Sequence, residues 1–274
     1  MNQRNETIDI AKGIGISLVV LFHCKIGDYS HLHDVVYCVH MPLFFVLAGI
    51  CFSTRYEFST FFVKKVLRLL VPMVIFTAIH IVILSCLPSH SLSSVLSRIP
   101  QHIPGALWFL NVLFLAEVIC FPFVNKVKTK LTNCIAIAIF GIGGAAISSV
   151  DLHIPQSLGS VPLACFFVLL GNKLKPYIKR ILTNKLSLII GSVIVFIILV
   201  KVTGTNVHLY DGMSEPIFVS ETLSIIGVMI CLCFCSTLEG TRIGGGIFDH
   251  RTEESRNNGR TSAIYHSYIS IVLD

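Results

Sequence analysis

The apolar segment at residues 8–24 carries three ionisable side chains, Asp9, Lys12 and His23. Lys12 and His23 are eleven positions apart, about three helical turns, so a helix would present both on one face, roughly 16 Å apart along its axis. In a membrane, such a pair is costly unless it faces a bundle interior or a wet cavity. We interpret His23 as a candidate general base, because imidazole titrates near neutral pH. The structural alternative is that Lys12 reaches the interface and His23 caps the other end.

Two later stretches hold further side chains that could do chemistry. His40 lies near the start of the second apolar segment, on the same side as His23. Lys65 and Arg68 are three positions apart in a basic stretch before the third segment, and residues at this spacing share a helical face. Two such cations would suit a phosphate group. The alternative is a stop-transfer signal, a basic cluster that only halts translocation of the chain across the membrane, and it is at least as common.

Other polar residues of the apolar segments have simpler interpretations. His31 and His33 lie near His23 and His40, but their spacing is not helical, and no acidic or thiol set completes a metal site. We therefore expect no metal, and we expect His31 and His33 to be hydrogen-bonded or solvent-facing. Glu117 and Glu221 are expected to make hydrogen bonds between helices.

The composition shows which kind of element must position these residues. Apolar residues make up 54% of the chain and charged residues only 13%, with a mean hydropathy of +0.79. A soluble domain carries about twice that share of charged residues. The apolar residues come in long blocks, and no small-residue cleavage site follows the first block. The sequence therefore predicts a multi-pass membrane protein that retains its first helix.

We predict an all-α fold, a polytopic transmembrane helix bundle of about eight spans followed by a short C-terminal apolar stub. The predicted spans are residues 8–24, 35–53, 67–87, 105–124, 131–150, 157–172, 186–203 and 216–237. The stub, residues 263–273, is too short to cross a membrane. We expect a single membrane domain over residues 1–274, with a polar cytosolic segment at 238–262.

The basic residues predict the orientation of this bundle. With the N-terminus in the cytoplasm, only Lys25, Arg98 and Lys201 of the 21 Lys and Arg residues fall in outer segments. Lys and Arg concentrate in cytoplasmic loops of membrane proteins, so we predict a cytoplasmic N-terminus. The net charge of +6 then reflects topology and contact with anionic lipid headgroups, and we expect no nucleic-acid partner.

Several motifs follow one another in a characteristic order along the chain. They are Arg4, Asp9, Lys12 and Gly13 leading to His23; His40-Met41-Pro42-Leu43-Phe44-Phe45 with Gly49; Lys65, Arg68 and Pro72; Leu107-Trp108-Phe109-Leu110; and Gly171-Asn172. Together, over roughly residues 4–237, they resemble the membrane acyltransferase-3 family, bacterial integral membrane enzymes that acylate, often O-acetylate, surface sugars. Lys12 and Lys65 stand where that family usually has arginine, which keeps the charge but loses bidentate phosphate geometry.

The resemblance implies an O-acyltransferase of the bacterial inner membrane, with acetyl-CoA as donor and a cell-surface or lipid-linked carbohydrate as acceptor. Acyl transfer needs a base for the hydroxyl proton and a donor for the developing oxyanion. His23 would be the base, and His40 would assist it or bind the acceptor. Lys12, Lys65 and Arg68 would hold the CoA phosphates or a negatively charged intermediate. Whether the CoA arm threads into the bundle or the acyl group is relayed across it stays open, as does the oligomeric state.

The end of the chain departs from the family pattern. Residues 259–266 resemble a late family segment with residues missing, and the resemblance implies about ten helices, so we expect a C-terminally truncated member. Two alternatives therefore remain. One is a catalytically inactive homologue. The other is a transporter or flippase for a polar or lipid-linked solute, which should show broken helices in paired positions. Only the segment at 157–172 looks broken.

Overall fold

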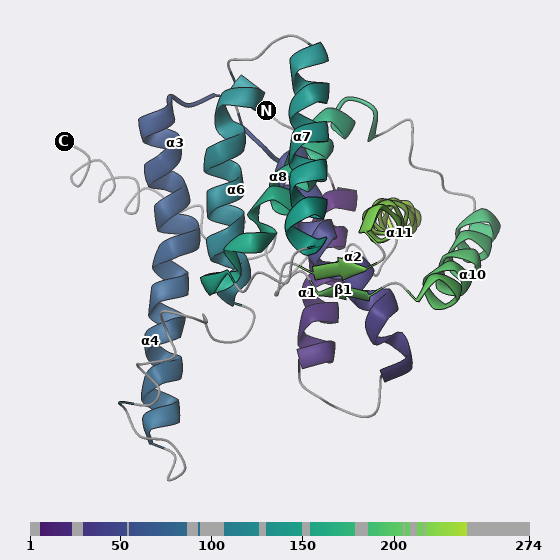
Figure 1. Ribbon diagram of the computed structural model, residues 1–274, viewed down its shortest axis with the longest axis horizontal. Helices are drawn as coiled ribbons and strands as arrows, with labels where there is room; N and C mark the ends of the chain where they lie inside the picture. Colours follow the sequence, from purple (N-terminus) through teal and green to yellow (C-terminus); the bar gives the residue numbers. More distant parts are fainter. Residues whose placement is uncertain are drawn as a thin grey trace, which may run out of the picture.

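The computed structural model describes residues 6–23, 30–53, 55–86, 93, 107–125, 130–149, 154–178, 186–204, 206–208, 213–215 and 217–239. In chain order the elements are α1 (Glu6–His23), α2 (Ser30–Ile50), α3 (Phe58–Lys65), the π-helical turn η1 (Val66–Leu70), α4 (Val71–Ser85), α6 (Trp108–Asn125), α7 (Lys130–Ser149), the 3-10 helix η3 (Pro155–Ser160), α8 (Val161–Leu174), α10 (Leu186–Thr203), β1 (Asn206–His208), β2 (Met213–Glu215) and α11 (Ile217–Thr237). Figure 1 shows them as a helical bundle with α4 and α10 at its periphery.

The predicted helical bundle is confirmed, and every predicted span overlaps a helix. A small antiparallel hairpin, β1 with β2, is added between α10 and α11, and pairs Asn206 with Glu215. Five segments of the described part are long and apolar enough to cross a membrane: His33–Ile50, Phe58–Ser85, Trp108–Asn125, Ser157–Leu174 and Phe218–Thr237. The eight-span count stays a prediction. The predicted stub and most of the predicted polar segment at 238–262 lie outside the described residues.

One predicted boundary is wrong. The third span, predicted at residues 67–87, begins earlier, because α3, η1 and α4 follow one another without a break over the 28-residue segment Phe58–Ser85. Such a helix is about 42 Å long, which exceeds a hydrocarbon core of about 30 Å. Pro72 lacks an N–H group, and its ring would crowd the Arg68 carbonyl four residues earlier in an ordinary α-helix. The wider turn of η1 lies directly before Pro72 and relieves that crowding, so the helix continues.

The centre of the bundle is the crossing of α2 with α8, where two glycines allow the backbones to touch. A Cβ atom at Gly49 would collide with the carbonyl oxygen of Val168, and one at Gly171 with that of Val46. Asn172 also donates from Nδ2 to the Gly49 carbonyl over 3.4 Å. Small residues permit this close approach in membrane helices. The crossing fixes the position of α2, which carries His40.

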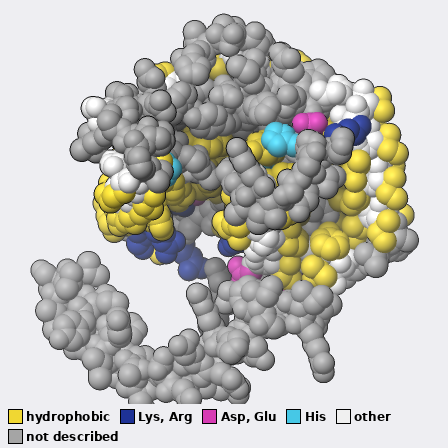
Figure 2. Space-filling model, turned by 90° about the horizontal axis from the view of Figure 1, so that it is seen from below, with side chains coloured by type: hydrophobic (Ala, Val, Ile, Leu, Met, Phe, Trp, Pro, Cys, Tyr) yellow, Lys and Arg dark blue, Asp and Glu magenta, His cyan; other side chains and the backbone are white. Residues whose placement is uncertain are grey.

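The bundle has two chemically different ends. At one, which we call the basic end, the chain after α2 meets the start of α3: the Phe52 and Phe61 rings stack at 5.2 Å, and Lys175 donates to the Phe52 carbonyl over 3.1 Å. The basic end holds Arg55, Lys64, Lys65, Arg68, Lys173 and Lys175. At the other, the histidine end, α1 and α2 are joined (Figure 1). In Figure 2 apolar side chains cover much of the described surface, and cationic groups gather beside them.

Candidate functional site

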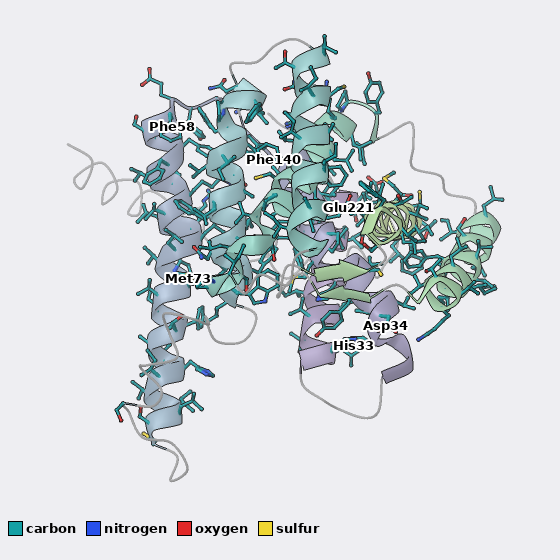
Figure 3. The ribbon with its side chains drawn as sticks, in the orientation of Figure 1. His33, Asp34, Phe58, Met73, Phe140 and Glu221 are labelled. Atoms are coloured by element: carbon teal, nitrogen blue, oxygen red, sulfur yellow. The ribbon has the colours of Figure 1, made fainter. Side chains whose placement is uncertain are left out.

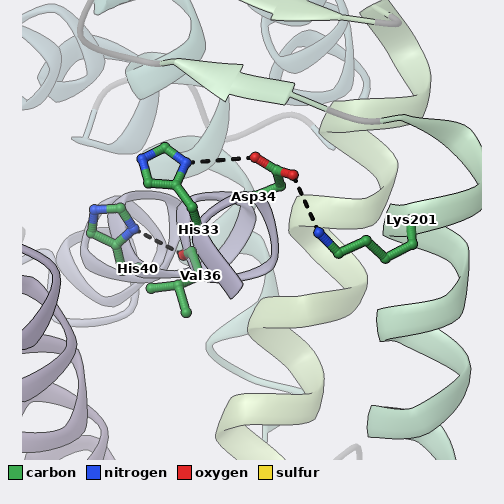
Figure 4. Close-up of polar contacts among 5 residues, drawn as sticks. All are labelled: His33, Asp34, Val36, His40 and Lys201. Carbon is green, nitrogen blue, oxygen red and sulfur yellow. Dashed lines mark hydrogen bonds and ion pairs between the residues drawn. The ribbon is translucent and has the colours of Figure 1, made fainter. Parts of the chain in front are cut away.

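His40 is the sequence-predicted site residue that the structure places most firmly. Its side chain is buried, with 1% exposure, on the face of α2 that packs inward. Its Nδ1 atom lies 2.9 Å from the Val36 carbonyl oxygen, one helical turn earlier (Figure 4). A carbonyl oxygen only accepts, so Nδ1 carries the proton, and the lone pair of the neutral ring is on Nε2. The backbone of α2 thus sets the tautomer that a proton acceptor needs.

A row of rings leads from His40 to the start of α2. The Tyr37 ring meets the His40 ring edge to face, with centroids 4.7 Å apart. The His33 ring stacks on Tyr37 with centroids 3.9 Å apart. These positions are three and four residues apart, which is the spacing that brings side chains onto one helical face. His33 is therefore part of an ordered row, and only about a third of its side chain is exposed.

An ion-pair bridge completes the histidine end. The Asp34 carboxylate lies 3.5 Å from His33 Nδ1 and 3.5 Å from Lys201 Nζ, so it joins α2 to α10 (Figure 4). Figure 3 shows His33 and Asp34 at the end of the bundle opposite Phe58, the first residue of α3. Sequence reasoning did not single out Asp34, and no local signal could have done so. Its partner Lys201 is 167 positions away.

The other two predicted residues of the first segment are less fully placed. His23 is the last residue of α1, so its backbone is at the histidine end, and its side chain lies outside the described residues. Lys12 forms an ion pair with Asp9 at 3.5 Å, and about half of its side chain is exposed, at 48%. The Gly15 backbone packs closely against the Phe44 ring, which orders α1 on α2. Lys12 thus lies away from His40, in the half of α1 nearer the basic end.

Lys65 and Arg68 differ in their surroundings, and their predicted shared face stays a prediction. Lys65 Nζ forms an ion pair with Glu117 Oε1 of α6 at 2.5 Å, with 23% of the lysine side chain exposed and 4% of the glutamate. Arg68 lies within η1 and is exposed. The Arg68 charge also acts on the Glu117 carboxylate, so both cations lie near this position of α6. Sequence reasoning gave Glu117 only a general helix-contact role.

Positive charge is concentrated before and along α3. Lys64 Nζ lies 3.5 Å from the centroid of the Tyr56 ring. A hydrogen bond with Lys64, together with the charges of Lys64, Arg55 and Arg68, lowers the pKa of the Tyr56 hydroxyl. Such a cluster favours an anion such as a phosphate. Sequence reasoning missed Tyr56.

The two chemical groups are well separated. Phe44, one turn after His40, contacts Phe109 at 5.6 Å between centroids, and Glu117 lies eight residues further along α6. At 1.5 Å per residue, His40 and the Lys65–Glu117 pair are about 18 Å apart along the bundle. Among the described residues, no group of three or more His, Cys, Asp or Glu side chains is placed to hold a metal ion.

The model of the acyltransferase-3 family, described as an acyltransferase domain, matches residues 5–247. The chain belongs to the acyltransferase-3 family. The nodulation protein NolL of Mesorhizobium japonicum is 26% identical to this acyltransferase-3 member over 156 residues, which cover 50% of the chain and 41% of NolL. The match thus spans about two fifths of the length of this curated relative. No solved structure matches the chain significantly.

Family membership makes the two ends of the bundle candidates for two parts of one site. An acyltransferase-3 protein needs a place for an acyl donor and a place for the attacking group. The basic end offers cations, and the histidine end offers a buried imidazole in a fixed tautomer. The apolar helices and the family together identify the chain as a membrane protein.

Proposed function

We propose that this protein is an O-acyltransferase of the bacterial inner membrane. It transfers an acetyl group from acetyl-CoA to a hydroxyl of a cell-surface or lipid-linked carbohydrate. The observation that carries the proposal is the buried His40 ring, whose Nδ1 proton is held by the Val36 carbonyl, in a chain of the acyltransferase-3 family. In this tautomer Nε2 can accept a hydrogen bond from an incoming hydroxyl.

The reaction divides between the two histidines. The acceptor hydroxyl attacks the thioester carbonyl, a C–O bond forms, and the C–S bond breaks. His23 takes the hydroxyl proton, since it ends α1 at the histidine end, and later returns the proton to the departing CoA thiolate. His40 accepts a hydrogen bond from the acceptor and orients it.

The cations of the other half hold the donor. Lys12, Lys65 and Arg68 bind the CoA phosphates or a negatively charged intermediate. Arg68 is exposed and Lys12 is half-exposed, so the described part of the chain does not cover either from a ligand. The separation of about 18 Å between the basic pair and His40 requires the donor arm to enter the bundle or the acyl group to be relayed.

The proposed topology follows from the charge distribution. Eight spans in one domain over residues 1–274 put the N-terminus and the basic end in the cytoplasm, where acetyl-CoA is made. The carbohydrate acceptor then meets the histidine end from the outer side. Contact of the basic end with anionic lipid headgroups fits the same orientation.

Transfer of labelled acetyl tests the proposal directly. The purified chain in lipid nanodiscs is given labelled acetyl-CoA and a panel of oligosaccharides and lipid-linked sugars, with His23→Ala as control. Labelled sugar is expected only with the unsubstituted protein. Unmodified sugar carried across vesicles, with no acetylation, would contradict the proposal and favour the transporter alternative.

A further inference from the structure

Glu117 is a buried carboxylate that the proposed chemistry does not yet use. It lies on α6 with 3% of the residue exposed, between the buried residues Ala116 and Cys120. Its Oε1 atom binds Lys65, and its Oε2 atom has no hydrogen-bond partner among the described residues. A carboxylate in such surroundings stays charged only because a cation is held against it.

The partner of Glu117 is less enclosed than Glu117 itself. Lys65 has 23% of its side chain exposed, against 4% for the glutamate. An ammonium group has three N–H donors, and Oε1 occupies one of them. The Lys65 Nζ atom also lies 5.4 Å from the Phe61 ring centroid, so the ammonium has an aromatic neighbour on α3 as well as the carboxylate on α6.

The pairing limits what Lys65 can do. If the ammonium moved away to follow a ligand, it would leave the Glu117 charge buried without a counter-ion, which is strongly unfavourable. Lys65 is therefore fixed in place, and a ligand must come to it. Arg68, on the next turn, is exposed, and its charge also acts on the Glu117 carboxylate.

We propose that Glu117 is a positioning residue of the donor site. It holds the Lys65 ammonium in a fixed position, so that the remaining N–H groups of Lys65 and the guanidinium of Arg68 bind one donor phosphate together. This inference rests on the proposed function. Protein kinases use the same physical device, a lysine held by a glutamate so that it meets nucleotide phosphates. A purely mechanical role, in which the pair only fastens α3 to α6, makes different predictions.

The test is a set of donor titrations at fixed acceptor on correctly inserted protein. Glu117→Gln is expected to raise the KM for acetyl-CoA by roughly tenfold, as for one lost charge-assisted hydrogen bond, with the acceptor KM within about twofold of the unsubstituted value. Glu117→Asp should recover part of the loss. Glu221→Gln, a buried carboxylate of α11, is the matched control and should leave the donor KM unchanged.

The exchange Lys65→Glu with Glu117→Lys separates the two roles and serves if Glu117→Gln fails to insert. It keeps an ion pair between the helices, so thermal stability should return toward that of the unsubstituted protein. The donor KM should stay high, because the ammonium now belongs to α6. Recovery of both stability and donor KM would overturn the inference, as would an unchanged donor KM in Glu117→Gln. Absence of transfer by the unsubstituted protein would overturn the proposed function itself, and the inference with it.

Discussion

At the scale of single residues, the backbone of α2 fixes the tautomer and the orientation of His40. The Val36 carbonyl fixes the tautomer, and the Tyr37 ring restricts the plane of the imidazole. Both restraints come from residues within one turn of His40, so they form as soon as the helix does. A base whose orientation is set locally costs no reorganisation when the substrate arrives.

Removing either histidine should stop transfer without unfolding the protein. His23→Ala is expected to abolish turnover, and His40→Gln should lower it by about 10²- to 10⁴-fold, the range of general acid–base effects. Turnover per correctly inserted molecule is the measurement. Near-normal turnover in inserted His23→Ala would make that residue structural and move the base to His40.

Arg68 should affect the donor and not the acceptor. It is exposed on η1 beside a lysine fixed by Glu117, and two cations can meet a diphosphate together. We expect Arg68→Ala to raise the donor KM by roughly tenfold with a smaller change in acceptor KM. If Arg68 is only part of a stop-transfer signal, Arg68→Ala should instead cause a topology defect, with unchanged kinetics in the correctly inserted fraction.

At the scale of elements, the crossing of α2 with α8 determines where His40 lies. The backbones touch at Gly49 and Gly171, and this crossing has no spare volume for a methyl group. Any side chain there forces the helices apart and displaces α2. The motif residues that resemble the family at these positions therefore serve packing, which in turn serves the site.

A methyl group at this crossing should be harmful, whereas one on α7 should not. Gly49→Ala is expected to destabilise the fold by about 1–3 kcal/mol, the cost of overpacking, and to lower turnover through α2. Gly143→Ala is the control, because a Cβ there meets no atom within 4 Å, and alanine favours a helix. Thermal unfolding in detergent measures both. Equal stability of the two variants would contradict the close crossing.

The helices and strands also show how much of the fold could be predicted from the sequence. Long apolar blocks predicted the helices because hydrocarbon demands about 20 apolar residues in a row. The continuous helix at Phe58–Ser85 was missed because Lys64, Lys65 and Arg68 interrupt the apolar pattern and Pro72 resembles a helix start. The hairpin of β1 and β2 was missed because three-residue strands have no readable alternation.

The candidate site was predictable only where its spacing is local. His40 and the nearby motif residues lie on one helix, and a pattern along the chain reveals them. The pairs Lys65–Glu117 and Asp34–Lys201 join positions 52 and 167 residues apart. Such pairs depend on which helices pack together, which the order of residues along one chain does not specify.

At the scale of the whole molecule, charge is sorted along the bundle. The cationic residues around α3 and the end of α8 meet at one end, while the row of His33, Tyr37 and His40 leads to the other. Under the proposed function, the donor binds at the basic end and the sugar at the histidine end, so either the donor arm or the acyl group must pass between them.

Both the N-terminus and residues 240–262 should be cytosolic. The uneven distribution of Lys and Arg predicts this orientation, and the contact of Thr7 with Glu239 over 2.8 Å puts the start of α1 beside the end of α11. A reporter that works only in the cytoplasm should be active when it is fused after Ser236. Activity confined to the periplasm would overturn the topology.

The helix at Phe58–Ser85 is packed at its α3 end and exposed along α4. No residue of α4 is buried by the described part of the chain, whereas the α3 half is attached to α6 by Lys65 and the ring contacts of Phe61. A helix longer than the hydrocarbon core tilts, and it tilts more in a thinner membrane. Because the α3 half is attached to α6, we expect acyl-chain length in the surrounding lipid to change the angle of this helix and with it the position of Arg68. Membrane thickness is thereby expected to affect how Arg68 binds an anionic ligand.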